Sequence, residues 1–246
     1  MKITFLGTNS WYDSQTGATV CTLIETKKQY IVLDAGFGLH KLDEYVKKPK
    51  PILLFISHLH IDHICGLHVF PKFNFKQKLT ILLPDRYVKL LKQFTNHPFT
   101  SPLKKQKFSS QIIGLKPGSY KKPIELISKK IDHVDYTLGY RFQIENKVIT
   151  YCCDTGVCRN VELLAKNCDL LINESSFLPG EHSAWGHTNP IEASKLAKKF
   201  NCKKLVLTHF APNRYPDIKT RQQAGRLACK IFPHTIIAQD NMVVEL

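Results

Sequence analysis

The chain has no apolar stretch long enough to cross a bilayer, and its first residues, Lys2 to Leu6, form a short strand-like run rather than the hydrophobic core of a signal peptide. These absences exclude a membrane-spanning protein and predict a soluble cytoplasmic one. No Pro/Gly/Ser-rich linker or low-complexity tract interrupts the 246 residues, of which 43% are hydrophobic. A chain of this size and composition can bury a substantial core, so we expect one domain over residues 1–246.

Acidic residues are scarce, because 20 Asp and Glu stand against 35 Lys and Arg, which gives a formal net charge of +15. Such an excess attracts anionic partners over long range and suits phosphate-bearing substrates, including RNA. The lysines are dispersed in doublets such as Lys47-Lys48 and Lys121-Lys122, a pattern typical of solvated surfaces. The eight cysteines do not occur in the closely spaced pairs of a zinc ribbon, and we interpret them as reduced structural thiols.

Both halves of the chain alternate short β-rich runs with amphipathic helical patterns. The predicted strands are residues 2–6, 20–25, 30–34, 52–56, 80–83, 124–131, 140–144, 147–151, 170–172, 205–207 and 235–238. The predicted helices are residues 39–46, 85–94, 161–165, 191–200 and 221–231, and the basic, Pro-interrupted segment 96–107 is predicted to be a loop. Periodicity alone supports a mixed α and β fold. Two β-rich halves favour two packed sheets, so we expect a four-layer αββα sandwich of two mixed sheets flanked by helices.

Four potential metal ligands lie within six residues, directly behind an apolar strand, in the segment Ser57-His58-Leu59-His60-Ile61-Asp62-His63. A lone histidine is usually structural, but four ligands at this spacing favour metal binding. His58 and His60 are two residues apart, so in an extended segment their side chains share a side. Asp62 and His63 follow where the chain is expected to enter a helix near Ile64. One short loop can therefore supply ligands to two neighbouring metal ions.

A centre with two metal ions needs more ligands than four, and the sequence offers further candidates at the ends of predicted strands. They are His133, Asp154 and His209. Side chains at strand ends are held rigidly, so these three residues are expected to complete the ligand set.

The ligand candidates occur together with two short glycine-containing segments, Phe5-Leu6-Gly7-Thr8 and Leu33-Asp34-Ala35-Gly36. In this combination the sequence resembles the metallo-β-lactamase superfamily over nearly the full chain, which implies the metallo-β-lactamase fold. The resemblance also implies two divalent metal ions, with His58, His60 and His133 on one, Asp62, His63 and His209 on the other, and Asp154 bridging them. Zinc suits this His/Asp set, and manganese or iron can occupy similar sites.

Several segments of the second half are similar to those of ribonuclease Z and its phosphodiesterase relatives. They are Asp132-His133, Gly139-Tyr140-Arg141-Phe142, Asp154-Thr155-Gly156, Asn173-Glu174-Ser175-Ser176-Phe177 and Gly186-His187-Thr188. This similarity implies phosphodiester substrates instead of β-lactams. Ribonuclease Z commonly carries a tRNA-binding arm between the Gly-Tyr-Arg segment and the bridging Asp, but only residues 142–153 intervene here. The short spacing looks more like that of compact phosphodiesterases acting on cyclic phosphates.

The resemblance suggests roles for three residues in a hydrolysis in which the two metals share a hydroxide. Asp62 would hold the nucleophilic water as base or orienter, or would act as a ligand only. His187 matches the family's catalytic histidine and would protonate the leaving group, and Glu174 would orient His187 or a nearby water. The remaining histidines are assigned to structure or surface, namely His40, His68, His97, His182 and His234.

The favoured function is that of a dizinc phosphodiesterase for a small or cyclic nucleotide-like substrate. A tRNA 3′-processing endonuclease of the ribonuclease Z type is the alternative, supported by charge and motifs and opposed by the missing arm. A lactone or thioester hydrolase stays open because the same metals can polarise a carbonyl group. An RNA-binding module with a non-catalytic metal site would also use the positive charge. No membrane partner is expected, and a homodimer is left open.

Overall fold

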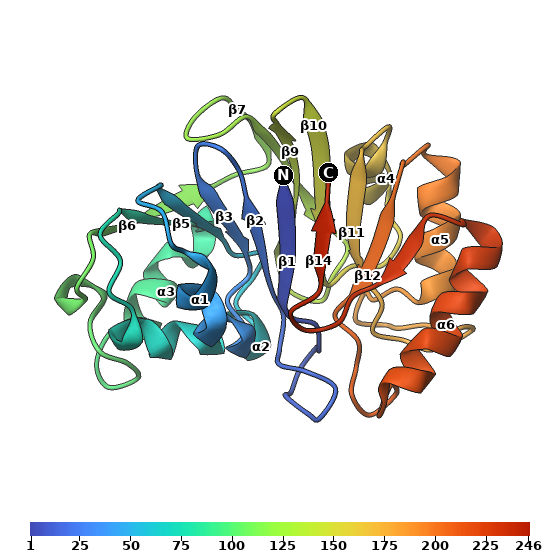
Figure 1. The fold of residues 1–246 in the computed structure, drawn as a ribbon, viewed down its shortest axis with the longest axis horizontal. Coiled ribbons are helices and arrows are strands. Elements are labelled where there is room, and N and C mark those ends of the chain that lie inside the picture. Colours follow the sequence, from blue (N-terminus) through green and yellow to red (C-terminus); the bar gives the residue numbers. More distant parts are fainter. The chain divides into compact units, whose positions relative to one another are not determined.

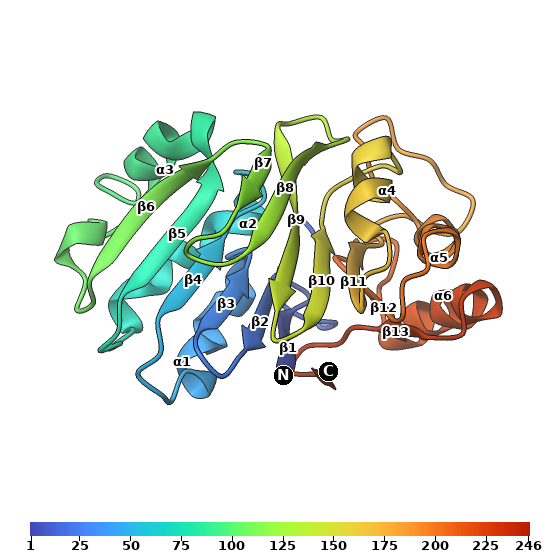
Figure 2. The same ribbon diagram turned by 90° about the horizontal axis from the view of Figure 1, so that it is seen from above.

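The computed structural model describes residues 1–246, which group into two compact units. Unit 1 consists of residues 1–8, 17–115 and 240–246, and unit 2 of residues 9–16 and 116–239. Each unit contains one mixed seven-stranded sheet with flanking helices (Figures 1 and 2). The organisation as a single domain stays a prediction. None of the helices combines the length and the apolar character that crossing a membrane requires.

The sheet of unit 1 has the strand order β14-β1-β2-β3-β4-β5-β6. Its strands are β1 (Lys2–Gly7), β2 (Cys21–Glu25), β3 (Tyr30–Leu33), β4 (Ile52–Phe55), β5 (Leu79–Pro84), β6 (Ser110–Leu115) and β14 (Val243–Glu245). Neighbours are antiparallel from β14 to β3 and parallel from β3 to β6. Every residue of β3, β4 and β5 is buried, which is the near-continuous apolar run typical of parallel strands.

The helical segments of unit 1 are short. They are α1 (Leu42–Tyr45), α2 (Ile61–Ile64) and α3 (Val88–Phe94), with 3-10 segments at Phe37–Lys41, Cys65–Lys72, Asp85–Tyr87 and Leu103–Lys105. The helix predicted over residues 39–46 is therefore split between a 3-10 turn and α1. The prediction that a helix begins near Ile64 is wrong, because α2 begins at Ile61 and holds Asp62 in its first turn, where a carboxylate is favoured by the helix dipole.

Asp240 joins separate parts of unit 1. Its carboxylate accepts hydrogen bonds from Thr8 Oγ1 at 2.8 Å, from the Ala18 amide at 2.9 Å and from Lys41 Nζ at 2.7 Å. A Cβ atom at Gly17, where φ is +148°, would lie 2.4 Å from Asp240 Oδ1. Glycine is therefore required for this close approach, and the segment just before β2 is tied to the last residues of the unit through one side chain.

The sheet of unit 2 has the order β13-β12-β11-β10-β9-β8-β7. Its strands are β7 (Gly118–Tyr120), β8 (Leu126–Ile131), β9 (Thr137–Ile144), β10 (Lys147–Cys152), β11 (Leu170–Glu174), β12 (Leu205–Thr208) and β13 (Thr235–Ile237), and its helices are α4 (Arg159–Ala165), α5 (Pro190–Lys199) and α6 (Ile218–Ile231). Neighbours are antiparallel from β7 to β10 and parallel from β10 to β13. Apolar residues of the three helices pack against β11 and β12 in one core cluster (Figure 1).

A two-residue turn connects β9 to β10. Glu145 and Asn146 both have positive φ, at 49° and 64°, and the flanking residues Ile144 and Lys147 are paired across the hairpin. This is the conformation of a tight type I′ turn, whose twist matches that of the strands it joins. No inserted segment therefore separates the Gly-Tyr-Arg strand from Asp154, as the sequence spacing predicts.

The fold class predicted from the sequence is confirmed, since two mixed seven-stranded sheets with flanking helices are present. The sequence reasoning missed three strands, β6, β7 and β14. All three lie at sheet edges, where a strand has only one neighbour and where short or polar sequences suffice. In β6, for example, five of the six residues are at least partly exposed, so its hydrophobic pattern is weak.

Candidate metal centre

Polar side chains gather at the carboxyl ends of the parallel strands in each unit. In unit 1, Asp34 follows β3 directly, and the segment 57–63 follows β4. In unit 2, Asp154 follows β10, Glu174 is the last residue of β11, and His209 follows β12. Because the carboxyl ends of parallel strands meet at one edge of a sheet, the topology brings these residues together within each unit, at the edge where open α/β sheets bind ligands.

The four ligand candidates of unit 1 form one compact set. The ring of His58 lies 4.4 Å from that of His60 and 4.3 Å from that of His63, measured between centroids. Asp62 Oδ2 lies 3.4 Å from His63 Nε2. His58, Asp62 and His63 are buried, and His60 is half-buried. The structure thus brings together all four residues that the sequence singled out in this unit.

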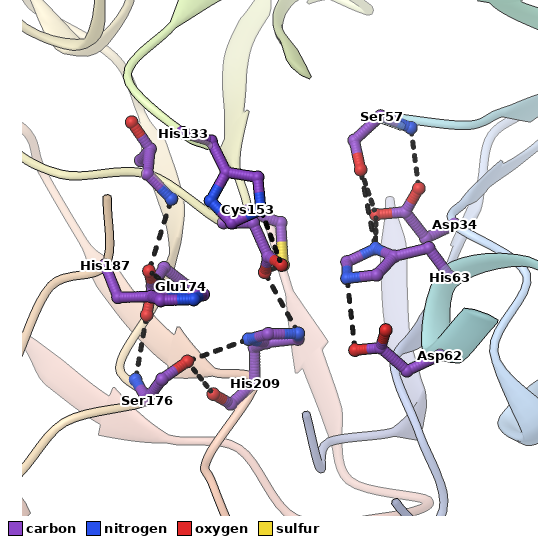
Figure 3. A network of polar contacts seen from close by, with 12 residues as sticks. Asp34, Ser57, Asp62, His63, His133, Cys153, Glu174, Ser176, His187 and His209 are labelled. Atoms are coloured by element: carbon purple, nitrogen blue, oxygen red, sulfur yellow. Dashed lines mark hydrogen bonds and ion pairs between the residues drawn. The ribbon is translucent and has the colours of Figure 1, made fainter. Parts of the chain in front are cut away.

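Asp34 and Ser57 hold two rings of this set, those of His58 and His63, and Figure 3 shows their contacts with His63. Asp34 Oδ2 accepts from His63 Nδ1 at 2.9 Å and from Ser57 Oγ at 2.9 Å, and Oδ1 accepts from the Ser57 amide at 2.7 Å. Ser57 Oγ in turn lies 3.0 Å from His58 Nδ1. The sequence reasoning assigned no role to Asp34 or Ser57, although a carboxylate directly after a buried strand was a signal that could have found Asp34.

In unit 2, two imidazoles approach the carboxylate of Asp154. His209 Nε2 lies 3.0 Å from Asp154 Oδ1, and His133 Nε2 lies 3.8 Å from Oδ2. The side chains of all three are at least 97% buried, and Cys153 Sγ lies 3.6 Å from Asp154 Oδ1. Two ligand atoms at about 2.0–2.2 Å from a tetrahedral metal ion are roughly 3.4 Å apart. The spacing of these donor atoms is therefore close to that of atoms sharing a metal.

The hydrogen bonds of Nδ1 indicate how each ring would meet a metal. In unit 2, His133 Nδ1 donates to the carbonyl of Gly186 at 3.2 Å. Ser176 Oγ donates its proton to the His209 carbonyl and lies 3.0 Å from His209 Nδ1. The Nδ1–H group is therefore the donor in the second hydrogen bond, and Ser176 Oγ accepts. His133 and His209 therefore carry their lone pair on Nε2, as does His63, whose Nδ1 donates to Asp34. Metal-binding histidines that are oriented by a hydrogen-bonded partner have this arrangement. The residues present therefore fit divalent metal ions.

Three of these residues also share an unusual backbone conformation. Asp34, Asp154 and His209 have φ values of 56°, 52° and 57°. Left-handed conformations are costly for residues other than glycine, by about 1–3 kcal/mol each, and they cluster at functional sites where the surrounding structure enforces them. Each of the three turns the chain sharply just after a strand, which directs its side chain to the sheet edge.

Buried Glu174 and half-buried His187 form a pair in unit 2 (Figure 3). Glu174 Oε1 lies 2.8 Å from His187 Nδ1, and the same carboxylate accepts from the amides of Thr155, Ser176 and Thr188. Burial lowers the pKa of His187, but the charge and hydrogen bond of Glu174 outweigh it, and the net pKa is raised above the usual value. The imidazolium form is thus stabilised at a fixed position.

Ring stacking also holds His187. Its ring stacks with that of Phe177, at 5.7 Å and 22°, and with that of His209, at 6.3 Å and 18°. Ligand atoms of Glu174, His187 and His209 all lie within 4.8 Å of one another. The sequence-predicted pair therefore stands directly beside one of the sequence-predicted ligands.

Residues outside the predicted site have structural or surface positions. Arg141 donates to the carbonyls of Leu164 and Lys166 and so closes the end of α4. The rings of His40 and His68 pack around Phe37, at 4.8 and 5.9 Å between centroids. The other three histidines are exposed, namely His97, His182 and His234.

Comparisons with known proteins agree with this architecture. The family model described as the β-lactamase superfamily domain matches residues 29–210. A ribonuclease Z from Saccharolobus solfataricus is 28% identical over 98% of this chain and 97% of its own length, and one from Sulfolobus acidocaldarius is 26% identical over 97% and 96%.

Solved structures show the same fold. The metallo-β-lactamase fold protein YhfI from Bacillus subtilis superposes with a TM-score of 0.82 at 23% identity, covering 100% of this chain and 98% of that one. The human short-form tRNase Z gives 0.76 at 21% identity with 100% and 99% coverage, and a diphosphatase of the PhnP family gives 0.77 at 15% with 100% and 97%. By its sequence match and its fold, the chain belongs to the metallo-β-lactamase superfamily, with similarity to ribonuclease Z.

Proposed function

We propose that this metal-dependent hydrolase is a phosphodiesterase that acts on a small or cyclic nucleotide-like phosphodiester. The observation that carries the proposal is the Glu174–His187 pair, with Nδ1 of half-buried His187 2.8 Å from Oε1 of buried Glu174 and the His187 ring stacked on that of His209. A cationic imidazole held beside a metal ligand is suited to give a proton to a leaving oxygen.

The ligand assignment belongs to the same proposal. His58, His60, Asp62, His63, His133, Asp154 and His209 would hold two divalent ions, which we take to be zinc. When bound, such ions lower the pKa of a water molecule and neutralise charge on the phosphoryl oxygens. The Nδ1 hydrogen bonds described above support the assignment, since they leave Nε2 of His63, His133 and His209 as the atom that would bind a metal.

The roles of the chain's own residues follow from their contacts. Glu174 accepts from Nδ1 of His187 and stabilises the imidazolium form, in which Nε2 carries the proton that the leaving alkoxide receives. Asp62 would accept a hydrogen bond from the attacking water and fix its direction. Its position 3.4 Å from His63 Nε2 is equally suited to a ligand, and both roles can be combined.

Two observations support a small substrate. The tight turn at Glu145-Asn146 occupies the place where ribonuclease Z commonly carries its tRNA-binding arm. The alignment with the Saccharolobus relative runs over 295 positions, more than the 246 residues of this chain, so the relative has segments without a counterpart here.

Hydrolysis of bis-p-nitrophenyl phosphate and of 2′,3′-cyclic nucleotides by the zinc-loaded protein tests the proposal. Turnover should be lost in His60→Ala and Asp154→Ala and retained in His182→Ala, a matched control whose imidazole is 82% exposed. Metal content, measured on the same samples, separates a ligand defect from misfolding. Absence of turnover by the fully loaded wild-type protein across this panel would refute the phosphodiesterase.

A tRNA 3′-processing endonuclease is the second candidate. It is favoured by the curated relatives named ribonuclease Z, which match nearly the whole chain. Incubation with a 3′-extended precursor tRNA decides between the candidates. Cleavage just after the discriminator nucleotide, at a rate above that on cyclic nucleotides, would establish the endonuclease, and an intact precursor would exclude it.

A further inference from the structure

Both tryptophans of the chain are exposed, and both belong to unit 2. Trp11 and Trp185 are the only two in the sequence, and their exposed fractions are 63% and 60%. Tryptophan is usually well buried because its large apolar ring contributes strongly to packing. Two rings left in water on loops therefore suggest a ligand that covers them.

Trp185 stands on a loop that is tied to a metal-ligand candidate. Its carbonyl accepts from the amide of Val134, the residue after His133, at 2.9 Å. The carbonyl of the next residue, Gly186, accepts from His133 Nδ1 at 3.2 Å. His187 follows immediately. The ring of Trp185 is therefore carried by backbone that is fixed to both His133 and the proposed proton donor.

Trp11 stands on a second loop, which is tied to another ligand candidate. The Ser10 amide donates to the carbonyl of Phe210, the residue after His209, at 3.0 Å, and Asn9 forms a bridge with Phe210. The buried Arg221 donates to Thr16 Oγ1 at 2.7 Å and to Asn9 Oδ1, so both ends of the loop are anchored.

The ring of Trp11 is itself oriented by a neighbour. It makes an edge contact with Tyr12, with 4.6 Å between centroids and 81° between planes, and Tyr12 is 38% exposed. This pair presents aromatic surface to solvent on a loop whose two ends are anchored. Such a ring loses little conformational entropy when a planar ligand stacks on it.

We propose that Trp185 and Trp11 are substrate-binding residues that stack on the heterocyclic base of the ester, so that the substrate is a nucleotide rather than a bare sugar phosphate. This inference rests on the proposed phosphodiesterase function and narrows its substrate class. Stacking on aromatic side chains is sequence-tolerant, because every base offers a π-face. It supplies recognition of the base, while the ligand set and His187 act on the phosphate.

Tryptophan fluorescence of the zinc-loaded protein gives a binding test that needs no turnover. AMP should quench the emission, whereas ribose 5-phosphate, which has the same phosphate and sugar but no base, should leave it nearly unchanged. In Trp11→Phe and Trp185→Phe one tryptophan remains as the reporter, so each ring is assessed alone. Equal quenching by AMP and ribose 5-phosphate would overturn the inference.

Kinetics give the second test. In Trp185→Ala and Trp11→Ala, KM for 2′,3′-cyclic AMP should rise about tenfold or more, as expected when stacking on one base is lost, with a smaller change in kcat. KM for glycerol 1,2-cyclic phosphate, which has no base, should stay within twofold of the wild-type value. Phe99→Ala removes another exposed ring, 66% exposed and on unit 1, and should change neither KM.

The outcomes separate this inference from the proposed function. Hydrolysis of both esters with parallel changes of KM in the tryptophan variants would overturn base stacking and leave the phosphodiesterase intact. Quenching by AMP without hydrolysis of either ester would support the base-binding site and refute the phosphodiesterase.

Discussion

Asp34 shows how much of the candidate centre depends on a residue that binds no metal in our proposal. Its carboxylate accepts hydrogen bonds from Nδ1 of His63 and from the amide and hydroxyl groups of Ser57. Replacing such a supporting group typically lowers metal affinity 10–100-fold, because the ligand ring loses its orientation and basicity. We expect a loss of about this size in Asp34→Asn, measured by zinc competition with a chromophoric chelator. Asp43→Asn, at a partly exposed ion pair with Lys72, should bind zinc as the wild type does.

Glu174 controls the protonation of His187, which gives a prediction about pH. Burial lowers the pKa of His187, but Glu174 raises it to a net value above the usual one. A proton donor works in its protonated form, so activity should fall as the pH rises through this raised pKa. In Glu174→Gln the raising charge is lost, and the descending limb of the kcat profile should move to lower pH. An unmoved limb would show that Glu174 does not act through His187.

The same pair affects stability in a defined pH range. Since the pKa of His187 is raised in the folded state, the protonated imidazole stabilises the fold below its ordinary pKa. This contribution is lost as the pH rises through the raised folded-state value. The melting temperatures of the wild type and Glu174→Gln should therefore differ more below that pH range than above it.

Gly186 occupies a position where a side chain would clash with neighbouring backbone. Its φ is +78°, and a Cβ atom there would lie 2.3 Å from the carbonyl oxygen of Asp132. Gly186→Ala should therefore displace the carbonyl that orients His133, and so lower both the melting temperature and zinc affinity. Gly180→Ala is the matched control, because φ is +89° but nothing lies within 4 Å of its Cβ. Equal effects of the two substitutions would mean that only backbone strain matters.

At the scale of secondary structure, α5 depends on a complete capping box. Asn189 Oδ1 accepts from the amides of Ile191 and Glu192, and the Glu192 side chain accepts from the Asn189 amide. Loss of such a cap costs about 1 kcal/mol, within a range of 0.5–2. Urea unfolding of Asn189→Ala should show this decrease, whereas Asn74→Ala, on an exposed loop, should stay near the wild-type value.

The elements that could be predicted from the sequence are those whose pattern is set by burial. The apolar runs of β4 and β5 and the Asn-Pro start of α5 are visible in the sequence because both packing and capping choose particular residue types. The edge strands β6 and β14 were missed because exposed positions allow many residues. Their pairing is decided by a neighbour distant in the chain, such as β1 for β14.

The candidate site shows the same limit. His58 to His63 could be found because the ligands are close in sequence, and His133, Asp154 and His209 because each follows a predicted strand. Ser57 and Ser176 could not be found in this way, because nothing in the sequence distinguishes a serine that orients an imidazole from any other loop serine. The left-handed conformations of Asp154 and His209 have no sequence signal either, because they arise from the packing around each strand end.

For the molecule as a whole, the formal charge of +15 predicts a strong dependence on salt. Attraction of an anionic substrate is screened as the Debye length falls, from about 10 Å at 0.1 M to about 3 Å at 1 M salt. KM for cyclic nucleotides should therefore rise with NaCl, while kcat changes little. Sucrose at matched osmolality should have no such effect. A KM that is flat across this range would show that the excess charge lies away from the path of the substrate.

The single side chain that joins the parts of unit 1 has a consequence for synthesis. Asp240, which ties Thr8, Ala18 and Lys41 together, is translated after all residues of unit 2. Unit 1 therefore cannot complete its sheet until the last residues are made, because it lacks both this anchor and the β14 neighbour of β1 until then. Most of unit 1 is translated first, yet its completion depends on residues 240–246, so removal of these residues should make residues 17–115 more sensitive to protease.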